Sequence, residues 1–188
     1  TNKYFFADES KLADLDSMFA DLIAEGNSVG AKLGVRVSNC PVGLGEPVFD
    51  KLDAELAKAI MSINAVKSVT IGNVENILEL RGSEVRDEIT QDGFKSNNAG
   101  GILGGISNGD LIELDFIIKP TSSIKSKGNT INANGEELEV EVTGRHDPCV
   151  GIRAVPIAEA MVNLVIMDHF LRNQAQCGLI DQSIPFKK

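Results

Sequence analysis

The segment from Pro156 to about Gln176 constrains the fold more than any other part of the chain, because it is helix-like and apolar on more than one face. Proline suits the first turn of a helix, so we expect the helix to begin at Pro156. Its apolar residues are Ile157, Ala158, Ala160, Met161, Leu164, Val165, Ile166, Met167, Phe170 and Leu171. A helix of this kind should be buried on several sides. The fold must therefore place other elements around it.

The rest of the chain mixes strand-like and helix-like segments without regular alternation. Alternating apolar residues predict strands over residues 31–37 and 138–142. A strongly β-prone run predicts another over 111–118, and a short apolar segment suggests one over 66–71. Helical spacing predicts helices over residues 10–26 and 48–62. The Asn134-Gly135 pair predicts a hairpin turn before the last strand, whose outer face is acidic. We therefore expect one α+β unit over residues 1–188, with long helices sandwiched between antiparallel β-sheets.

Composition argues against several classes of protein. The net charge is −9, aromatic residues make up 5% of the chain and tryptophan is absent, so a nucleic-acid-binding surface is not expected. Cys40, Cys149 and Cys177 are odd in number, widely separated and without CxxC or histidine-rich spacing, so neither a zinc site nor a disulfide framework is expected, which fits a reducing compartment. The apolar run 157–167 is interrupted and too short to span a bilayer, and no signal peptide is visible. We expect a cytoplasmic protein without a membrane partner.

Two segments have residues suited to holding a ligand. Residues 97–109 are dense in glycine, which permits a backbone to approach a flat ring or a phosphate closely, although tight turns explain the same glycines. The spacing fits neither a dinucleotide fingerprint nor a P-loop. Residues 119–123 combine an ammonium group with three hydroxyl groups directly after a predicted strand. Such a turn could hold a phosphate or could simply be solvated.

The polar loop before the apolar helix has two interpretations. An extended backbone would place Arg145 and Asp147 on one side, and Pro148 favours that geometry. In the first interpretation, Arg145 and Asp147 form an ion pair that anchors the loop. In the second, Arg145 binds an anionic ligand while Asp147 takes part in proton transfer. Arg153 either completes an anion site or pairs with Glu159, and the residues alone slightly favour the anchoring ion pair.

Five motifs together resemble chorismate synthase. The longest is RHDPCVGIRAVPIAEAM at residues 145–161, which is similar to the C-terminal signature of that family. The others, in the same order as in the family, are GLGEPVFD at 43–50, MSINAVK at 61–67, NAGGILGGISNG at 98–109 and KPTSSI at 119–124. These long motifs are far more specific than any single pattern above, and the likeness covers nearly the whole chain.

The resemblance implies an enzyme that converts 5-enolpyruvylshikimate 3-phosphate to chorismate by 1,4-anti elimination of phosphate, using reduced FMN without net redox change. It also implies a homotetramer, and NADPH as reductant if the enzyme reduces its own flavin. The Asp147 position resembles the carboxylate that assists proton removal. The positions that resemble flavin contacts are Asn64, Ala65, Gly104, Lys119, Pro120, Thr121, Ser122, Ser123 and Arg145.

The chain departs from the family in length. Full-length members are about twice as long, and the two acidic histidines of the family lie in their N-terminal half. Here only His146 and His169 occur, neither in those histidine motifs. We therefore expect a C-terminal half of a chorismate synthase that is inactive alone. The alternative from another class is a non-catalytic flavin- or phosphate-binding module, or a half-domain that serves only assembly.

Overall fold

The centre of the fold is a three-stranded antiparallel sheet. The computed structural model describes residues 2–144 and 146–178. The sheet has the order β1-β7-β2 and comprises β1 (Ala31–Val37), β7 (Ile112–Ile118) and β2 (Val66–Ile71). Ile118, at the end of β7, is opposite Ala31 on one side and Val66 on the other. The last residue of β7 and the first residues of β1 and β2 therefore lie at the same end of the sheet. The candidate site described below is at this end.

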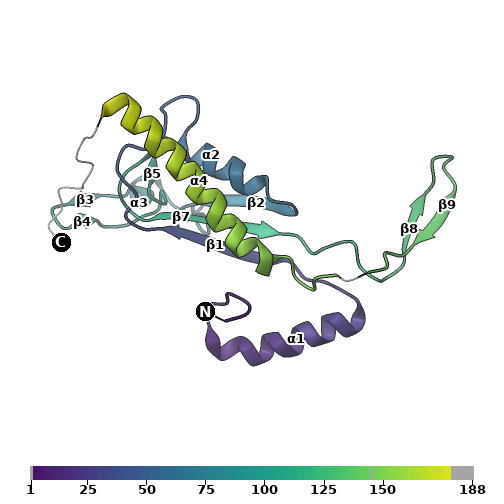
Figure 1. Cartoon of the computed structure of the whole chain (residues 1–188). Helices are drawn as coiled ribbons and strands as arrows, with labels where there is room; N and C mark the ends of the chain where they lie inside the picture. The colour runs from purple at the N-terminus through teal and green to yellow at the C-terminus, as the bar shows by residue number, and fades with distance from the viewer. Residues whose placement is uncertain (1, 145, 179–188) are drawn as a thin grey trace.

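Two helices cover one face of this sheet, α2 (Leu52–Met61) and α4 (Gly151–Cys177) (Figure 1). The alternate β7 residues that face them are buried: Ile112, Leu114, Phe116 and Ile118. The other face of the sheet is charged. There Arg36 forms ion pairs of 2.9 Å with both Glu113 and Asp115. The period-2 pattern read from the sequence thus separates a core face from a solvated face, and the α+β class with antiparallel sheets is confirmed.

The observed α4 starts earlier than expected. It begins at Gly151, so Pro156 is its sixth residue and not a first-turn residue. Proline lacks the N–H that would bond the Ile152 carbonyl, a loss of one helical hydrogen bond. Close packing offsets this loss: Ala154 is buried, and a Cβ on Gly151 would lie 2.5 Å from the Ala31 Cβ. The polar loop therefore ends before residue 151.

Burial of α4 on several sides is not observed within the described chain. One face is buried through Ala154, Ala158, Val162 and His169. The opposite face exposes Ile157, Leu164, Met167 and Leu171 by 48%, 67%, 55% and 59%. By length and composition alone α4 could cross a membrane, with 22% of its most apolar window buried, but core helices of soluble proteins pass the same test. An apolar helix face therefore lies open.

Shorter elements surround the sheet. They are η1 (Glu9–Lys11), α1 (Leu12–Glu25), α3 (Gly82–Val85), β3 (Ile89–Thr90), β4 (Gly93–Phe94), β5 (Ile102–Leu103), β6 (Ile106–Ser107), β8 (Gly128–Ile131) and β9 (Glu137–Val140). The Asp8 side chain accepts the N-terminal capping hydrogen bond from the Ser10 amide at the start of η1, and Gly26 ends α1 at φ +66°. The expected helix over 48–62 begins at Leu52, which leaves Phe49 84% exposed.

The β8–β9 hairpin projects beyond the end of the sheet (Figure 1). Its register pairs Thr130 with Leu138, and this face, which also carries Val140, is apolar. The opposite face carries Ile131 with Glu137 and the acidic residues that the sequence predicts. All eight strand residues are exposed. The acidic outer face is confirmed, whereas the apolar face has no covering element in the described chain.

Candidate functional site

One end of the sheet gathers most of the predicted site segments. The Lys119 amide donates to the Ala65 carbonyl at 2.9 Å, which joins the end of β7 to the turn before β2. The Ser28 hydroxyl donates to the Thr121 carbonyl at 2.7 Å, and the adjacent Val29 amide donates to the Pro148 carbonyl at 2.8 Å. The segments 64–65, 119–121 and 147–148 therefore converge where β7 ends and α4 begins.

A pocket of about 330 Å³ opens at this end of the sheet. It is lined by Ser62, Ile63, Asn64, Ile118, Val150, Arg153, Ala154, Ile157 and Met161. An apolar wall with a few polar groups is typical of small-molecule sites. Among the lining residues Arg153 is the only charged one. The pocket is therefore suited to a largely apolar ligand that carries a negative group at one end.

The turn between α2 and β2 presents Asn64 and Ala65. Its backbone is fixed by hydrogen bonds from Ile63 to the Ile60 carbonyl at 3.1 Å and from Val66 to the Ile63 carbonyl at 3.2 Å. Ala65 adopts φ +70°, a left-handed conformation that costs a non-glycine residue about 1 kcal/mol. Such strain is held in place by surrounding structure and clusters at binding sites. The observation agrees with a ligand-binding turn.

Asp147 pairs with Arg153. Arg153 Nε lies 2.7 Å from one carboxylate oxygen of Asp147, and Nη2 lies 3.1 Å from the other. The expected partner Arg145 lies outside the described residues. The alternative pairing of Arg153 with Glu159 is wrong, because helical side chains lean towards the N-terminus. Since α4 starts at Gly151, Arg153 stands in its first turn and reaches back to Asp147.

The 119–123 segment is partly anchored and partly open. Thr121 is held through its carbonyl, and Pro120 packs against Gly30, where a Cβ would lie 3.2 Å from the proline ring. Lys119, Ser122 and Ser123 are exposed. Among the described residues the Lys119 ammonium forms no ion pair. A fixed backbone with a free cation and hydroxyl groups could bind a phosphate, so this interpretation stays a prediction.

Gly104 is not brought together with these residues. It lies in the β5–β6 turn, and the neighbouring Gly105 carbonyl accepts from the Leu52 amide at 2.9 Å, at the start of α2. Asn64 follows the end of that helix, so the two positions are about 15 Å apart along α2. A Cβ at Gly104 would meet no atom within 4 Å. The glycine is open to a ligand, but at the opposite end of α2.

Neither histidine lines the pocket. His146 is half-buried and lies 3.4 Å from the Val142 carbonyl through Nε2. His169 is 2% exposed on α4, and its Nδ1 has no hydrogen-bond partner in the described structure. Cys149 is a buried, packed thiol with Sγ 4.0 Å from the Gly30 carbonyl. His146, His169 and Cys149 therefore do not supply a proton donor at the pocket wall.

A carboxylate that was not predicted from the sequence, Asp87, organises the glycine-dense loop. Asp87 accepts hydrogen bonds from the Asn98 amide at 2.7 Å, the Ala99 amide at 2.8 Å and the Ser96 hydroxyl at 2.6 Å. Partial burial acts to raise the pKa of Asp87, but these hydrogen bonds outweigh it and hold the pKa below its ordinary value. The only signal in the sequence was a charged stretch, which usually indicates a solvated surface.

Replacement of Asp87 is expected to destabilise the fold in a pH-dependent way. Asp87→Asn places an amide group against an N–H donor, and we expect a loss of about 1 to 2 kcal/mol at pH 7 for this half-buried group. A lowered pKa gives stability that is present above the ordinary value of 3.8 and is lost as pH falls through the folded-state value. Urea unfolding at pH 7 and pH 3 should show the difference between wild type and variant shrinking at pH 3.

The adjacent carboxylate provides a control for Asp87. Glu88 is exposed and pairs with Lys95 at 2.7 Å and Arg86 at 3.4 Å, without contacting the glycine-dense loop. Glu88→Gln should leave the unfolding free energy nearly unchanged. An equal loss for both variants, or a loss in Asp87→Asn that persists at pH 3, would contradict the anchoring role.

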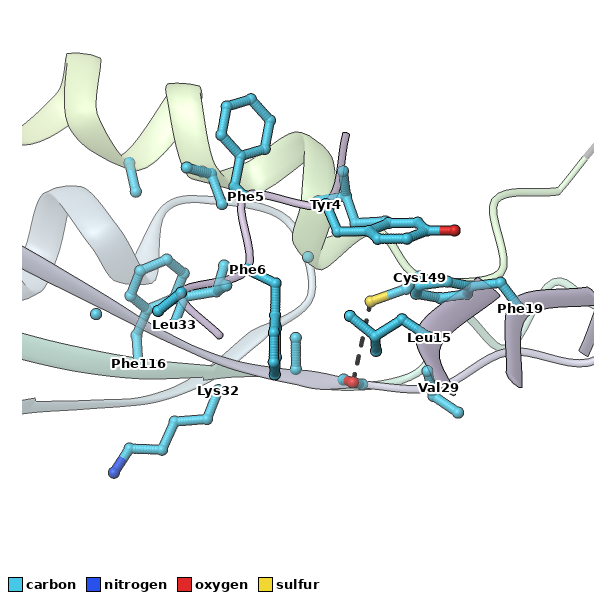
Figure 2. A pocket seen from close by; sticks show the side chains of 18 of the residues that line it. Tyr4, Phe5, Phe6, Leu15, Phe19, Val29, Lys32, Leu33, Phe116 and Cys149 are labelled. Atoms are coloured by element: carbon cyan, nitrogen blue, oxygen red, sulfur yellow. Dashed lines mark hydrogen bonds between the residues drawn. The ribbon is translucent and has the colours of Figure 1, made fainter. Parts of the chain in front are cut away.

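A second cavity of about 470 Å³ lies between α1, β1 and the start of α4. Figure 2 shows that Tyr4, Phe5, Phe6 and Phe19 gather around it, whereas the Lys32 ammonium points away. The cavity wall is mainly apolar and includes none of the site residues expected from the sequence. We therefore take the smaller pocket at the end of the sheet, which is lined by Asn64 and Arg153, as the candidate functional site.

The fold is an α+β unit with antiparallel sheets, and its candidate site is a pocket whose lining is suited to a small molecule with an anionic group. Comparison with known proteins is more specific. The family model for chorismate synthase matches residues 1–171. A solved structure described as a crystal structure of chorismate synthase is 28% identical, with a TM-score of 0.68 over 87% of this chain. This chain belongs to the chorismate synthase family. It spans 44% of the length of that structure's chain.

Proposed function

We propose that this chain is the C-terminal part of a chorismate synthase, acting as a single folded unit. The complete enzyme would convert 5-enolpyruvylshikimate 3-phosphate to chorismate and phosphate by 1,4-anti elimination in the cytoplasm, as a step of aromatic amino-acid biosynthesis. The family match supports the reaction class. The observation that carries the proposal is the convergence of the segments 64–65, 119–121 and 147–148 beside one pocket.

The residues at this end of the sheet fit a flavin mononucleotide. The apolar wall suits a ring, the strained turn at Asn64 and Ala65 presents backbone groups to it, and Lys119 with Thr121 to Ser123 suits the phosphate. Reduced FMN would supply electron density to the elimination and recover it at the end. Arg145 remains part of the proposal, and Gly104 could take part only at the far end of α2. NADPH is the proposed reductant if the flavin is reduced within the enzyme.

Asp147 would take part in moving the substrate proton. Before a ligand binds, both of its oxygens accept from the Arg153 fork, which orients the carboxylate beside the pocket-lining guanidinium. This role requires the ligand to approach from the pocket side, where Asn64 and Ile118 form the wall.

Further polypeptide would complete the site. The exposed α4 face, with Leu164 67% accessible, fits contact with another layer of the same enzyme. The apolar face of the β8–β9 hairpin, which extends from the site end of the sheet, fits subunit contacts in a homotetramer (Figure 1). Since neither His146 nor His169 lines the pocket, the described residues lack the acids expected for the reaction. We infer that the chain alone is inactive.

Anaerobic binding and turnover measurements test this proposal. Titration of the chain with reduced FMN should show saturable binding by calorimetry, and stopped-flow mixing with 5-enolpyruvylshikimate 3-phosphate should yield no chorismate. Measurable chorismate formation would refute inactivity of the chain alone. Absence of FMN binding would instead favour a half-domain that serves only assembly.

A further inference from the structure

The only charged side chain that lines the pocket, Arg153, forms an ion pair with a carboxylate of the same chain, Asp147. Arg153 lines the pocket and presents two nitrogens to the two oxygens of Asp147, at 2.7 Å and 3.1 Å. This paired arrangement is the one that a guanidinium forms with carboxylate and phosphate ligands. The Asp147 carboxylate therefore has the position and charge of a ligand's anionic group.

The pair is weak enough to be exchanged. The Arg153 side chain is 68% exposed and that of Asp147 is 31% exposed. Ion pairs between accessible side chains contribute little net free energy, because water screens them and replaces their hydrogen bonds. An incoming anion could take the guanidinium without breaking the fold, since the neighbouring Pro148 carbonyl remains fixed by the Val29 amide at 2.8 Å.

The surroundings favour an anion over a cation. No aspartate or glutamate is among the residues that line the pocket, although the whole chain has a net charge of −9. Ile118 forms part of the wall, and the next residue, Lys119, is exposed and has no ion-pair partner in the described part of the chain. The one charged side chain that lines this pocket of an acidic protein is thus a cation, Arg153.

We propose that Arg153 is an anion-binding residue of this pocket, and that Asp147 competes with a ligand phosphate or carboxylate for its guanidinium. Exchange would release the Asp147 carboxylate at the moment the anion binds. The inference depends on the proposed function for the identity of the ligand, but not for its charge. It assigns a binding role to a residue outside the set expected from the family resemblance.

The competition predicts opposite effects for the two partners. Inorganic phosphate would be titrated into the isotope-labelled chain and binding followed by NMR. The Arg153 Nε–H resonance reports binding where Arg153 is present, and the backbone amide resonances of the pocket report it in Arg153 variants. Arg153→Gln should weaken phosphate binding about tenfold, because a paired charged contact is lost. Asp147→Asn should tighten it by about threefold, because the internal competitor is removed.

Arg172 provides the matched control. It lies on the same helix and pairs with Asp50 at 2.8 Å and Asp168 at 2.9 Å, but it does not line the pocket. Arg172→Gln should leave phosphate affinity within about twofold of wild type. Arg153→Lys keeps the charge without the fork, so its affinity should fall between wild type and Arg153→Gln. Weaker or unchanged binding in a folded Asp147→Asn variant would overturn the proposal, as would wild-type affinity in Arg153→Gln.

Three ligands distinguish the source of the anion. If Arg153→Gln weakens FMN but leaves riboflavin unaffected, the guanidinium binds the cofactor phosphate. If it weakens 5-enolpyruvylshikimate 3-phosphate alone, the guanidinium binds the substrate. If Arg153→Gln leaves the affinity for every ligand that binds the wild type unchanged, the inference is overturned. If phosphate shows the predicted pattern while FMN fails to bind, the proposed function fails and the role of Arg153 stands.

Discussion

Gly72→Ala is expected to lower the unfolding free energy by about 3 to 5 kcal/mol, among the largest losses for any single methyl group added to this chain. Gly72 follows β2 with φ +73°, and a Cβ there would lie 2.2 Å from the Asn98 carbonyl oxygen and 2.8 Å from the Gly100 amide nitrogen. These are backbone atoms that cannot rotate away. The Gly72 amide also donates to the Glu113 carbonyl at 2.9 Å, so movement would break a sheet contact.

Gly104→Ala separates steric overlap from backbone strain. Gly104 has φ +63°, close to that of Gly72, but a Cβ there would meet no atom within 4 Å. Only the left-handed conformation should cost free energy, about 1 kcal/mol. Thermal unfolding should place Gly72→Ala about 10 °C or more below wild type and Gly104→Ala only a few degrees below. Equal shifts would show that the close approach of residues 72 and 98 does not limit stability.

Alternation and β-propensity predicted the sheet, most clearly in β1 and β7, where burial alternates along the strand. The expected strand at 31–37 coincides with β1, and that at 111–118 differs from β7 by one residue. Side chains alternate strictly in a strand, so burial on one face leaves a clear pattern. The Asn134-Gly135 turn was equally readable, since Gly135 adopts φ +83° at the tip of the β8–β9 hairpin.

Helix starts were predicted less well, because packing overrides local signals. Pro156 marks a typical first turn, yet α4 starts five residues earlier, where Gly151 packs on Ala31. This shift moved Arg153 into the first turn and made it the partner of Asp147. No local pattern contains the contact between residues 31 and 151, so the pairing at the site could not be read from spacing.

The convergence of residues at the candidate site was predicted only in part. The family resemblance identified Asn64, Ala65 and Lys119, and the structure brings these residues to one end of the sheet. It placed Gly104 in the same list, although α2 separates that glycine from the others. Asp87 was missed because its partners are backbone amides 11 and 12 residues away, which have no sequence signature.

Opposite faces of α4 should respond very differently to a buried charge. Val162 is 1% exposed within the core, so Val162→Asp should cost about 3 to 5 kcal/mol through an unpaired buried carboxylate. Leu164 is two residues further along and 67% exposed, so Leu164→Asp should change the stability of this chain by less than about 0.5 kcal/mol. Chemical denaturation of both variants measures the contrast.

The same pair of substitutions tests whether α4 is covered in a longer enzyme. In this chain Leu164→Asp removes apolar surface from water and should reduce binding of a hydrophobic dye. In the complete polypeptide that the proposed function requires, Leu164 would be buried, and Leu164→Asp should become about as damaging as Val162→Asp. A complete enzyme that tolerates Leu164→Asp would show that this face stays in water. Its apolar character would then need an explanation other than a second layer of the fold, because an apolar helix face is normally packed against another element.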